Sequence, residues 1–232
     1  MPQKTVNTFL GVMLLLISVP VAWGASKNKD EETFTHAVTV LQAMLSGNAV
    51  PTSLLRKAEC VIVLPVVKKF CFGVGGSGGR GPMLCRTGKN FSGRWSAPAM
   101  YTIGGVSAGL QVGGSSTDYV LLVVTQKGVD ALLKGKTKLG DEATAAAGPS
   151  GATASDIGSD IITYGRAKGL FAGVSLGGAT LEPDQDANKR LYGKDLTADE
   201  IVIKNAVPTP AAGRSLVTLL NSKTAKTPAK KK

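Results

Sequence analysis

Histidine is almost absent from this sequence, which contains only His36 among its 232 residues. A serine or cysteine nucleophile needs a neighbouring base, and histidine most often fills that role. His36 falls on the polar face of a predicted amphipathic helix, with no evident route to a nucleophile. The near absence of histidine therefore argues against hydrolysis, and we expect a protein that is not an enzyme.

The pattern G-x-S-x-G nevertheless occurs twice, around Ser107 and Ser175. In hydrolases, such a serine stands on a sharp turn from a strand into a helix. Both serines here fall in the middle of predicted strands, so neither has that setting. The sequence predicts no catalytic residue.

Cysteine is also scarce: the chain has Cys60, Cys71 and Cys85, and no C-x-x-C pair. With the single histidine elsewhere, this pattern predicts no metal site. An oxidising compartment would permit one disulfide and leave one thiol over. Because Cys60 and Cys71 are flanked by apolar residues, we expect small buried side chains in preference to a bridge.

An apolar run long enough to span a bilayer is missing at the N-terminus. The run Phe9–Val19 is well short of the roughly 20 residues that a spanning helix needs, and Pro20 follows it. Lys4 before the run, with Ala22 and Gly24 after it, is typical of a secretory signal that is cleaved after Gly24. No cysteine follows for lipid attachment. The sequence thus predicts an exported protein, periplasmic or in the cell envelope, that is soluble or peripheral to a membrane.

Acidic residues are few relative to basic ones, 16 against 27, which gives a net charge of +11. Five lysines lie in residues 223–232, and subtracting these five and Lys4 from +11 leaves about +5 on the folded part. A basic excess of this size favours anionic partners without predicting any specific nucleic acid. Residues 222–232 are predicted to form a basic disordered tail that can touch envelope polymers without specificity.

Glycine is plentiful, but it forms no convincing nucleotide-binding loop. The segment 73–78 satisfies G-x-G-x-x-G, yet Gly81-Pro82 follows too soon for the helix that this motif must open. The triplet GKT at 135–137 lacks the glycine that a phosphate-binding loop carries five residues earlier. We therefore predict no cofactor. The segment 70–86 is more simply a glycine-rich hairpin or a bulge between two strands.

Small and apolar residues alternate with a period of two in Gly104–Gly114 and in Arg166–Thr180, a pattern typical of strands. Glycine inside a strand leaves room for another layer or a ligand. We expect Arg166–Thr180 to be a central strand, and both stretches to belong to one curved sheet. Further predicted strands are Cys60–Val67, Asp118–Thr125 and Asp156–Tyr164.

Apolar residues recur at helical spacing over Asp30–Leu45, and Gly47 ends the run. The polar face of this helix has no lysine or arginine, which favours docking onto the sheet over insertion into an anionic bilayer. Thr197 and Glu200 form the capping box of a later helix. The other predicted helices cover 52–58, 127–133, 185–191, 197–203 and 211–221. These elements predict an α+β fold, with a strongly curved antiparallel β-sheet or barrel-like sheet flanked by N-terminal and C-terminal helices.

Several short motifs stand in an order that resembles the SYLF domain family. They are GGSG at 75–78, WSAP at 95–98, AGP at 147–149, KGLFAGVSL at 168–176, Asn188 with Tyr192-Gly193, and Val207-Pro208. The likeness covers nearly the whole chain after the leader, so we expect one SYLF-like domain at 25–221.

This resemblance implies a phospholipid-binding module without catalysis. Eukaryotic relatives bind phosphoinositide-containing membranes, often beside an SH3 or FYVE module, and some fungal members bind and bundle actin. Bacterial relatives are mostly exported stand-alone domains, which would meet neither phosphoinositides nor actin. We therefore expect binding to anionic phospholipids or a membrane surface. The alternative is a structural or interaction protein of the cell envelope that binds another macromolecule through the sheet face or the lysine-rich tail.

Basic residues that flank the predicted glycine-striped strands are the candidate lipid-binding site, since each contributes about 1 kcal/mol near an anionic surface. They are Lys68, Lys69, Arg80, Arg86, Arg166 and Lys168.

Overall fold

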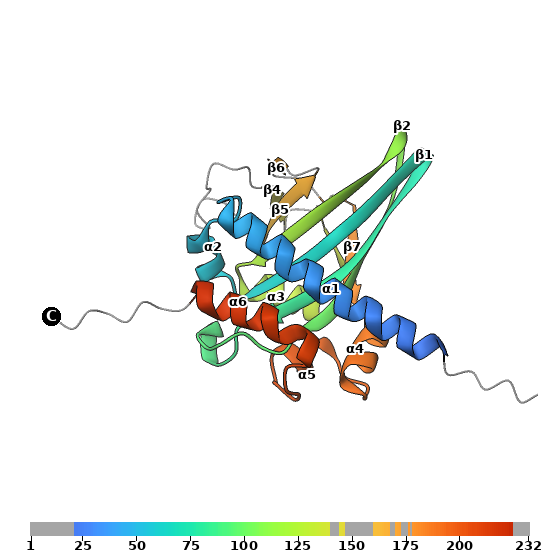
Figure 1. Ribbon diagram of the computed structural model, residues 1–232. Helices are drawn as coiled ribbons and strands as arrows, with labels where there is room; N and C mark the ends of the chain where they lie inside the picture. The colour runs from blue at the N-terminus through green and yellow to red at the C-terminus, as the bar shows by residue number, and fades with distance from the viewer. Residues whose placement is uncertain are drawn as a thin grey trace, which may run out of the picture.

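The computed structural model describes residues 21–139, 144–146, 160–167, 170–172, 176 and 178–224. Its centre is strand β2 (Ala99–Val123), which pairs along almost its whole length with strand β1 (Cys60–Cys85) in antiparallel register. On its other edge, the first part of β2 pairs with β7 (Thr180–Pro183) and the last part with β5 (Ile161–Ala167). The middle of β2 therefore projects as a two-stranded ribbon with β1 (Figure 1).

Short strands complete the sheet. β3 (Thr137–Lys138) pairs with β7, and β6 (Leu170–Ala172) pairs antiparallel with β5. β4 (Thr144–Ala146) also pairs with β5, as the one parallel pair among the described strands. The result is a strongly curled, mostly antiparallel sheet with helices at both chain ends, which confirms the predicted α+β class.

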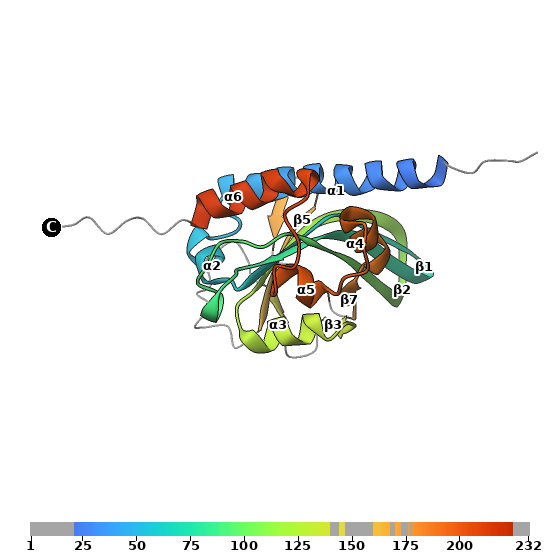
Figure 2. The ribbon, with the colours of Figure 1, turned by 90° about the horizontal axis from the view of Figure 1, so that it is seen from below.

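Both faces of the sheet are covered, because its strands carry apolar residues in both directions. In β1, Val61 and Val63 belong to the core under the long helix α1 (Val21–Ser46), whereas Ile62 and Leu64 belong to a second core inside the curl. Figure 2 shows α1 and the C-terminal helix α6 (Arg214–Thr224) side by side on one face, with α3 (Gln126–Leu133) on the other. Two buried faces explain the continuous apolar run at the start of β1.

Strand β1 folds back on itself, so that its two halves lie against each other. A disulfide joins Cys60 and Cys85, the first and last residues of β1. A Cβ added to Gly81 would lie 1.8 Å from the carbonyl oxygen of Val63, so only glycine permits this contact. The expectation of small buried cysteines in preference to a bridge was wrong, because apolar surroundings do not reveal which distant residues a folded-back strand brings together.

The helices follow the predicted order. The remaining ones are α2 (Thr52–Lys57), α4 (Gln185–Tyr192) and α5 (Ala198–Val202), with 3₁₀ turns η1 (Lys89–Phe91) and η2 (Ala211–Gly213). The capping box predicted at the start of α5 is present, with reciprocal bonds between Thr197 and Glu200. Helix α1 docks onto the sheet as expected and buries Phe34, Leu41 and Met44.

The strand predictions need one correction. Arg166–Thr180 is no single central strand, because β5 ends at Ala167, β6 covers only Leu170–Ala172 at the edge, and β7 begins at Thr180. The segment 73–85 belongs to β1, whose pairing with β2 shifts by a bulge between Phe72 and Val74, so the bulge predicted as one alternative for this glycine-rich segment is present. Period-two alternation identified strand residues but did not reveal where a strand bends or ends.

The predicted secretory signal falls mostly on residues 1–20, outside the described part of the chain. Helix α1 begins at Val21 and runs through the expected cleavage point after Gly24. Within the described residues, no helix combines the length and the apolar character that crossing a bilayer requires. The signal and the export that it implies stay predictions.

Candidate functional site

The projecting part of the sheet, residues 68–76 of β1 with residues 105–116 of β2, is named the ribbon tip here. Residues 105–116 pair with β1 only, as far as the described strands extend. At the base of the ribbon, a bulge sets Val66 at a positive φ of 57°, and its N–H donates to Asp118 Oδ1 at 3.0 Å. Because bulges bend a strand and increase its twist, this one turns the ribbon away from the body of the protein.

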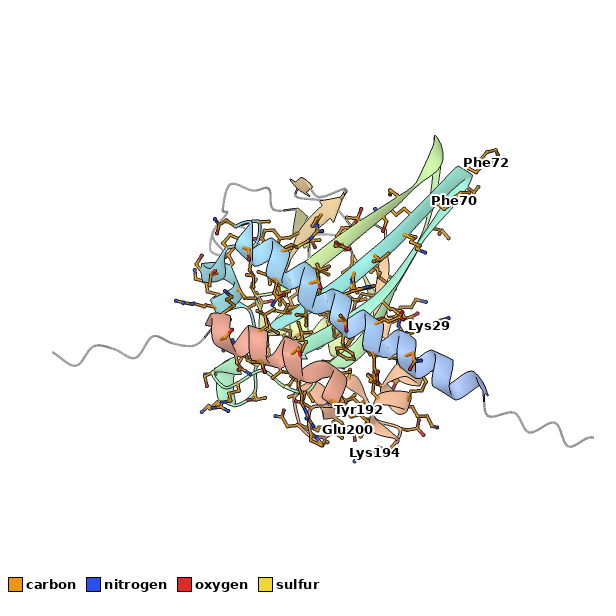
Figure 3. The ribbon with its side chains drawn as sticks, viewed as in Figure 1. Lys29, Phe70, Phe72, Tyr192, Lys194 and Glu200 are labelled. Atoms are coloured by element: carbon orange, nitrogen blue, oxygen red, sulfur yellow. A yellow bond between two sulfur atoms is a disulfide. The ribbon has the colours of Figure 1, made fainter. Side chains whose placement is uncertain are left out.

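Apolar side chains on the ribbon tip are exposed. Phe70 and Phe72 alternate along β1 and so share one face, with exposed fractions of 65% and 72%. Beyond the bulge, Val74 is exposed by 74%, and Val106, at 87%, stands opposite Gly76. Figure 3 shows Phe70 and Phe72 at the far end of the ribbon, pointing away from the body of the protein.

This exposure has a simple structural cause. A two-stranded ribbon with no third strand and no covering helix cannot bury its apolar face. Apart from Val66 at the base, all the large exposed hydrophobic residues of the described chain lie on this tip. A concentrated apolar patch on an otherwise ordinary surface typically marks an interaction site.

Two predicted site residues, Lys68 and Lys69, lie on the ribbon tip. Both are exposed, opposite Ser116 and Ser115 of β2, and neither forms an ion pair with a described residue. Lys68 shares the face of Phe70, so a positive charge adjoins the apolar patch.

Arg80 has another role. Its Nη2 donates to Asp30 Oδ1 and lies 3.3 Å from Asp184 Oδ2. Asp30 is completely buried on α1, and Arg190 of α4 holds it from the other side, with Nε 3.0 Å from Oδ2. The hydrogen bond to Asp30 raises the pKa of Arg190. The buried carboxylate of Asp30, with its two arginine partners, thus ties helix α1 to strand β1 and helix α4.

The last three predicted residues are Arg166, Arg86 and Lys168. The first two lie apart from the ribbon tip. Arg166 is 3.7 Å from Asp118 at the ribbon base. Arg86 stacks over the ring of Trp95 at 4.8 Å, and burial lowers its pKa. Lys168 lies outside the described residues.

The structure thus brings Lys68 and Lys69 together with an apolar face that sequence reasoning missed. The alternation of Phe70, Phe72 and Val74 in the sequence was a usable signal for these apolar side chains. It was obscured because the segment that follows resembles a glycine-rich hairpin.

The arrangement offers no catalytic machinery within the described residues. Ser107 lies inside β2 opposite Gly75, with no helix after it, and His36 is exposed on α1. Ser175 lies outside the described part. No group of three or more potential metal ligands occurs among the residues that the structure describes.

Two tyrosines, the buried Tyr101 and the half-buried Tyr192, act as structural donors. The hydroxyl of Tyr101 donates to the carbonyl of Leu132 at 3.2 Å, and that of Tyr192 donates to the carbonyl of Pro98 at 2.6 Å. Burial raises the pKa of both side chains, so they stay neutral.

A family model and similar curated proteins indicate the same family for this chain. The model of the Ysc84 family, described as "Las17-binding protein actin regulator", matches residues 104–223. An SH3 domain-containing protein of Schizosaccharomyces pombe, PJ696.02, is 33% identical over 214 residues, 88% of this chain and 48% of that protein.

Two further relatives agree. The SH3 domain-containing YSC84-like protein 1 of Rattus norvegicus is 34% identical over 76% of this chain and 52% of its own length. LAS seventeen-binding protein 3 of Saccharomyces cerevisiae is 29% identical over 83% of this chain and 43% of its own length. The chain spans about half the length of the curated relatives it matches, and the names of these relatives describe domains and binding.

Proposed function

This chain belongs to the Ysc84 (SYLF) family, and from that membership together with the exposed ribbon tip we propose that it binds anionic membrane surfaces without catalysis. The observation that carries the proposal is the group of exposed apolar side chains on the ribbon tip, Phe70, Phe72, Val74 and Val106, with Lys68 beside Phe70. Apolar residues that enter the acyl boundary, next to cations that meet head-group phosphates, are the two elements of interfacial binding.

The expected contributions are large enough for reversible binding. Burying a phenylalanine is worth about 1.5–3 kcal/mol, and Phe70 and Phe72 are exposed by 65% and 72%. Each lysine near an anionic surface adds about 1 kcal/mol. Together with Val74 and Val106, the gross gain is about 8 kcal/mol, before the cost of association is subtracted. Such a balance favours peripheral, salt-sensitive attachment.

The test is co-sedimentation with vesicles of phosphatidylcholine alone and of phosphatidylcholine containing phosphatidylglycerol. We expect the protein to pellet with the anionic vesicles and to be partly released by salt, because the charge term is screened. Equal pelleting with both vesicle types at every salt concentration would contradict the role of charge.

Variants separate the two contributions. Phe70→Ser with Phe72→Ser should weaken vesicle binding by about two to three orders of magnitude, since it removes about 3–4 kcal/mol of apolar burial. Lys68→Glu with Lys69→Glu should abolish the preference for anionic vesicles. The matched control is Lys127→Glu with Lys134→Glu, which changes the charge equally on and just after α3. Indistinguishable binding by the two charge variants would sink the assignment to the tip.

The second candidate is an interaction protein of the cell envelope that uses the lysine-rich tail. Removing residues 225–232 tests it while keeping Thr224, whose hydroxyl accepts a hydrogen bond from Trp95 Nε1. Under the membrane proposal, the truncated protein keeps its vesicle binding. Complete loss of binding would assign the activity to the tail. Export to the periplasm or cell envelope is part of the same proposal, and fractionation of the expressing cells checks it.

A further inference from the structure

A second surface lies at the end of the ribbon opposite its tip. A half-open groove of about 1000 Å³ is lined by the end of α2, the η1 loop and the second half of α6. Its floor includes Glu59 and Arg86, the residues next to the bridged Cys60 and Cys85. In Figure 1, α2 and the end of α6 lie on the side of the molecule away from the ribbon tip.

The groove is cationic. Arg56 and Lys57 project from α2, Arg94 lies on the facing loop, and Arg86 is at the floor. None of these four side chains forms an ion pair with a residue that the structure describes. Elsewhere in the described chain, most arginines are paired with carboxylates. Unpaired arginines suit carboxylate or phosphate partners, because the planar guanidinium donates two parallel hydrogen bonds.

Two atoms of the floor residues have no hydrogen-bond partner among the described residues. They are Arg86 Nε, a donor, and Glu59 Oε2, an acceptor, and both are covered from solvent. Buried polar atoms are nearly always satisfied, so a pair of unsatisfied ones in one groove requires an explanation. Because both atoms are covered, a ligand in the groove meets the exposed cations Arg56, Lys57 and Arg94 and not these two atoms.

The η1 loop adds a conformational observation. Asn90 and Phe91, which line the groove, both have positive φ values, 53° and 51°. Non-glycine residues adopt this conformation at a cost, and such residues cluster at binding and catalytic sites. The wall of the groove is therefore held in an unusual shape by the surrounding structure.

We propose that this groove binds an extended acidic segment of a polypeptide partner. Its carboxylates meet the exposed cations at the rim, Arg56, Lys57 and Arg94. Asn221 and Ser222 of α6 supply further polar groups along the wall. A membrane head group fits less well, because the groove faces away from the tip that we assign to the membrane.

The test measures fluorescence anisotropy of a short fluorescein-labelled peptide that alternates glutamate and serine, with the full chain at about 0.15 M salt. We expect saturable binding, and we expect the double variant Arg56→Glu with Arg94→Glu to weaken it by about tenfold or more. Both side chains are exposed, so the variant should fold normally. The lysine-rich tail is identical in the natural chain and in the double variant, so its contribution to peptide affinity is the same in both.

Arg214→Glu is the control, since Arg214 is exposed at the start of α6 and does not line the groove. It should change peptide affinity by less than about twofold. The proposal would be overturned if peptide affinity fell by the same factor per reversed charge in Arg214→Glu and in the Arg56→Glu, Arg94→Glu variant. Net charge alone would then explain the binding. Displacement of the peptide by inorganic phosphate, or by anionic vesicles in the Phe70→Ser, Phe72→Ser variant, would overturn it in favour of a phosphate or lipid site.

Discussion

Loss of the Cys60–Cys85 bridge should destabilise the fold more than a typical surface substitution. The bridge joins residues separated by 25 positions. In the chain-entropy model, closing a loop of that length stabilises the folded state by about 3.5 kcal/mol relative to the unfolded chain. For a domain of this size, that corresponds to about 10 °C in Tm.

The assay compares urea unfolding of the oxidised protein with that of the protein kept reduced. The midpoint should fall on reduction, and the double variant Cys60→Ala with Cys85→Ala should be at least as unstable, since it also removes two buried sulfurs. Cys71→Ala is the matched control, because it leaves the bridge intact. Thiol counting in denaturant supplies an independent check: of the three cysteines, only Cys71 should react in the oxidised protein.

Two results would refute this reasoning. Three reactive thiols in the oxidised, denatured protein would mean that the bridge does not form. One reactive thiol with a change in unfolding free energy below about 1 kcal/mol would mean that the folded-back strand is held by packing alone.

Four other substitutions test the core and the groove. Asp30→Asn leaves two arginines around a buried neutral amide and should cost about 3 kcal/mol in urea unfolding. Gly81→Val should cost at least about 3 kcal/mol, because its Cβ would meet backbone, whereas Gly78→Ala, with nothing within 4 Å, should cost about 1 kcal/mol or less. Burial raises the pKa of Glu59 above its usual value of 4.5, so the folded state binds this proton more readily than the unfolded state, and stability falls as pH rises from about 4.5 through the folded-state pKa. Glu59→Gln should therefore be stabilising relative to the natural protein at pH 7 and nearly neutral at pH 4, when both are unfolded with urea.

Helices were the most predictable part of this fold, since each follows from contacts close in sequence. The apolar spacing over Asp30–Leu45 and the capping box at Thr197 needed no knowledge of the rest of the chain, and the structure contains both. The long ribbon was less predictable. Local rules cannot distinguish a glycine-rich hairpin from a strand that bends, because both need glycine for close backbone approach.

The candidate site shows the same limit. A basic excess could be assigned to Lys68 and Lys69 from the sequence, but the sequence does not show that Arg80 is taken up by a buried aspartate 50 residues earlier. The exposure of Phe70 and Phe72 depends on the absence of a described third strand beside 105–116 of β2. That absence is a property of sheet order, which a single sequence does not specify.

The folded-back ribbon gives the molecule two ends with different surface chemistry. The apolar tip and the cationic groove lie on opposite sides of the molecule (Figure 1), so their residues do not contact one another. Substitutions at such a separation usually act independently. Tip variants should therefore change vesicle binding without changing peptide affinity, and rim variants should do the reverse. If both proposals hold, the chain would hold an acidic partner at a membrane, which neither surface would achieve alone.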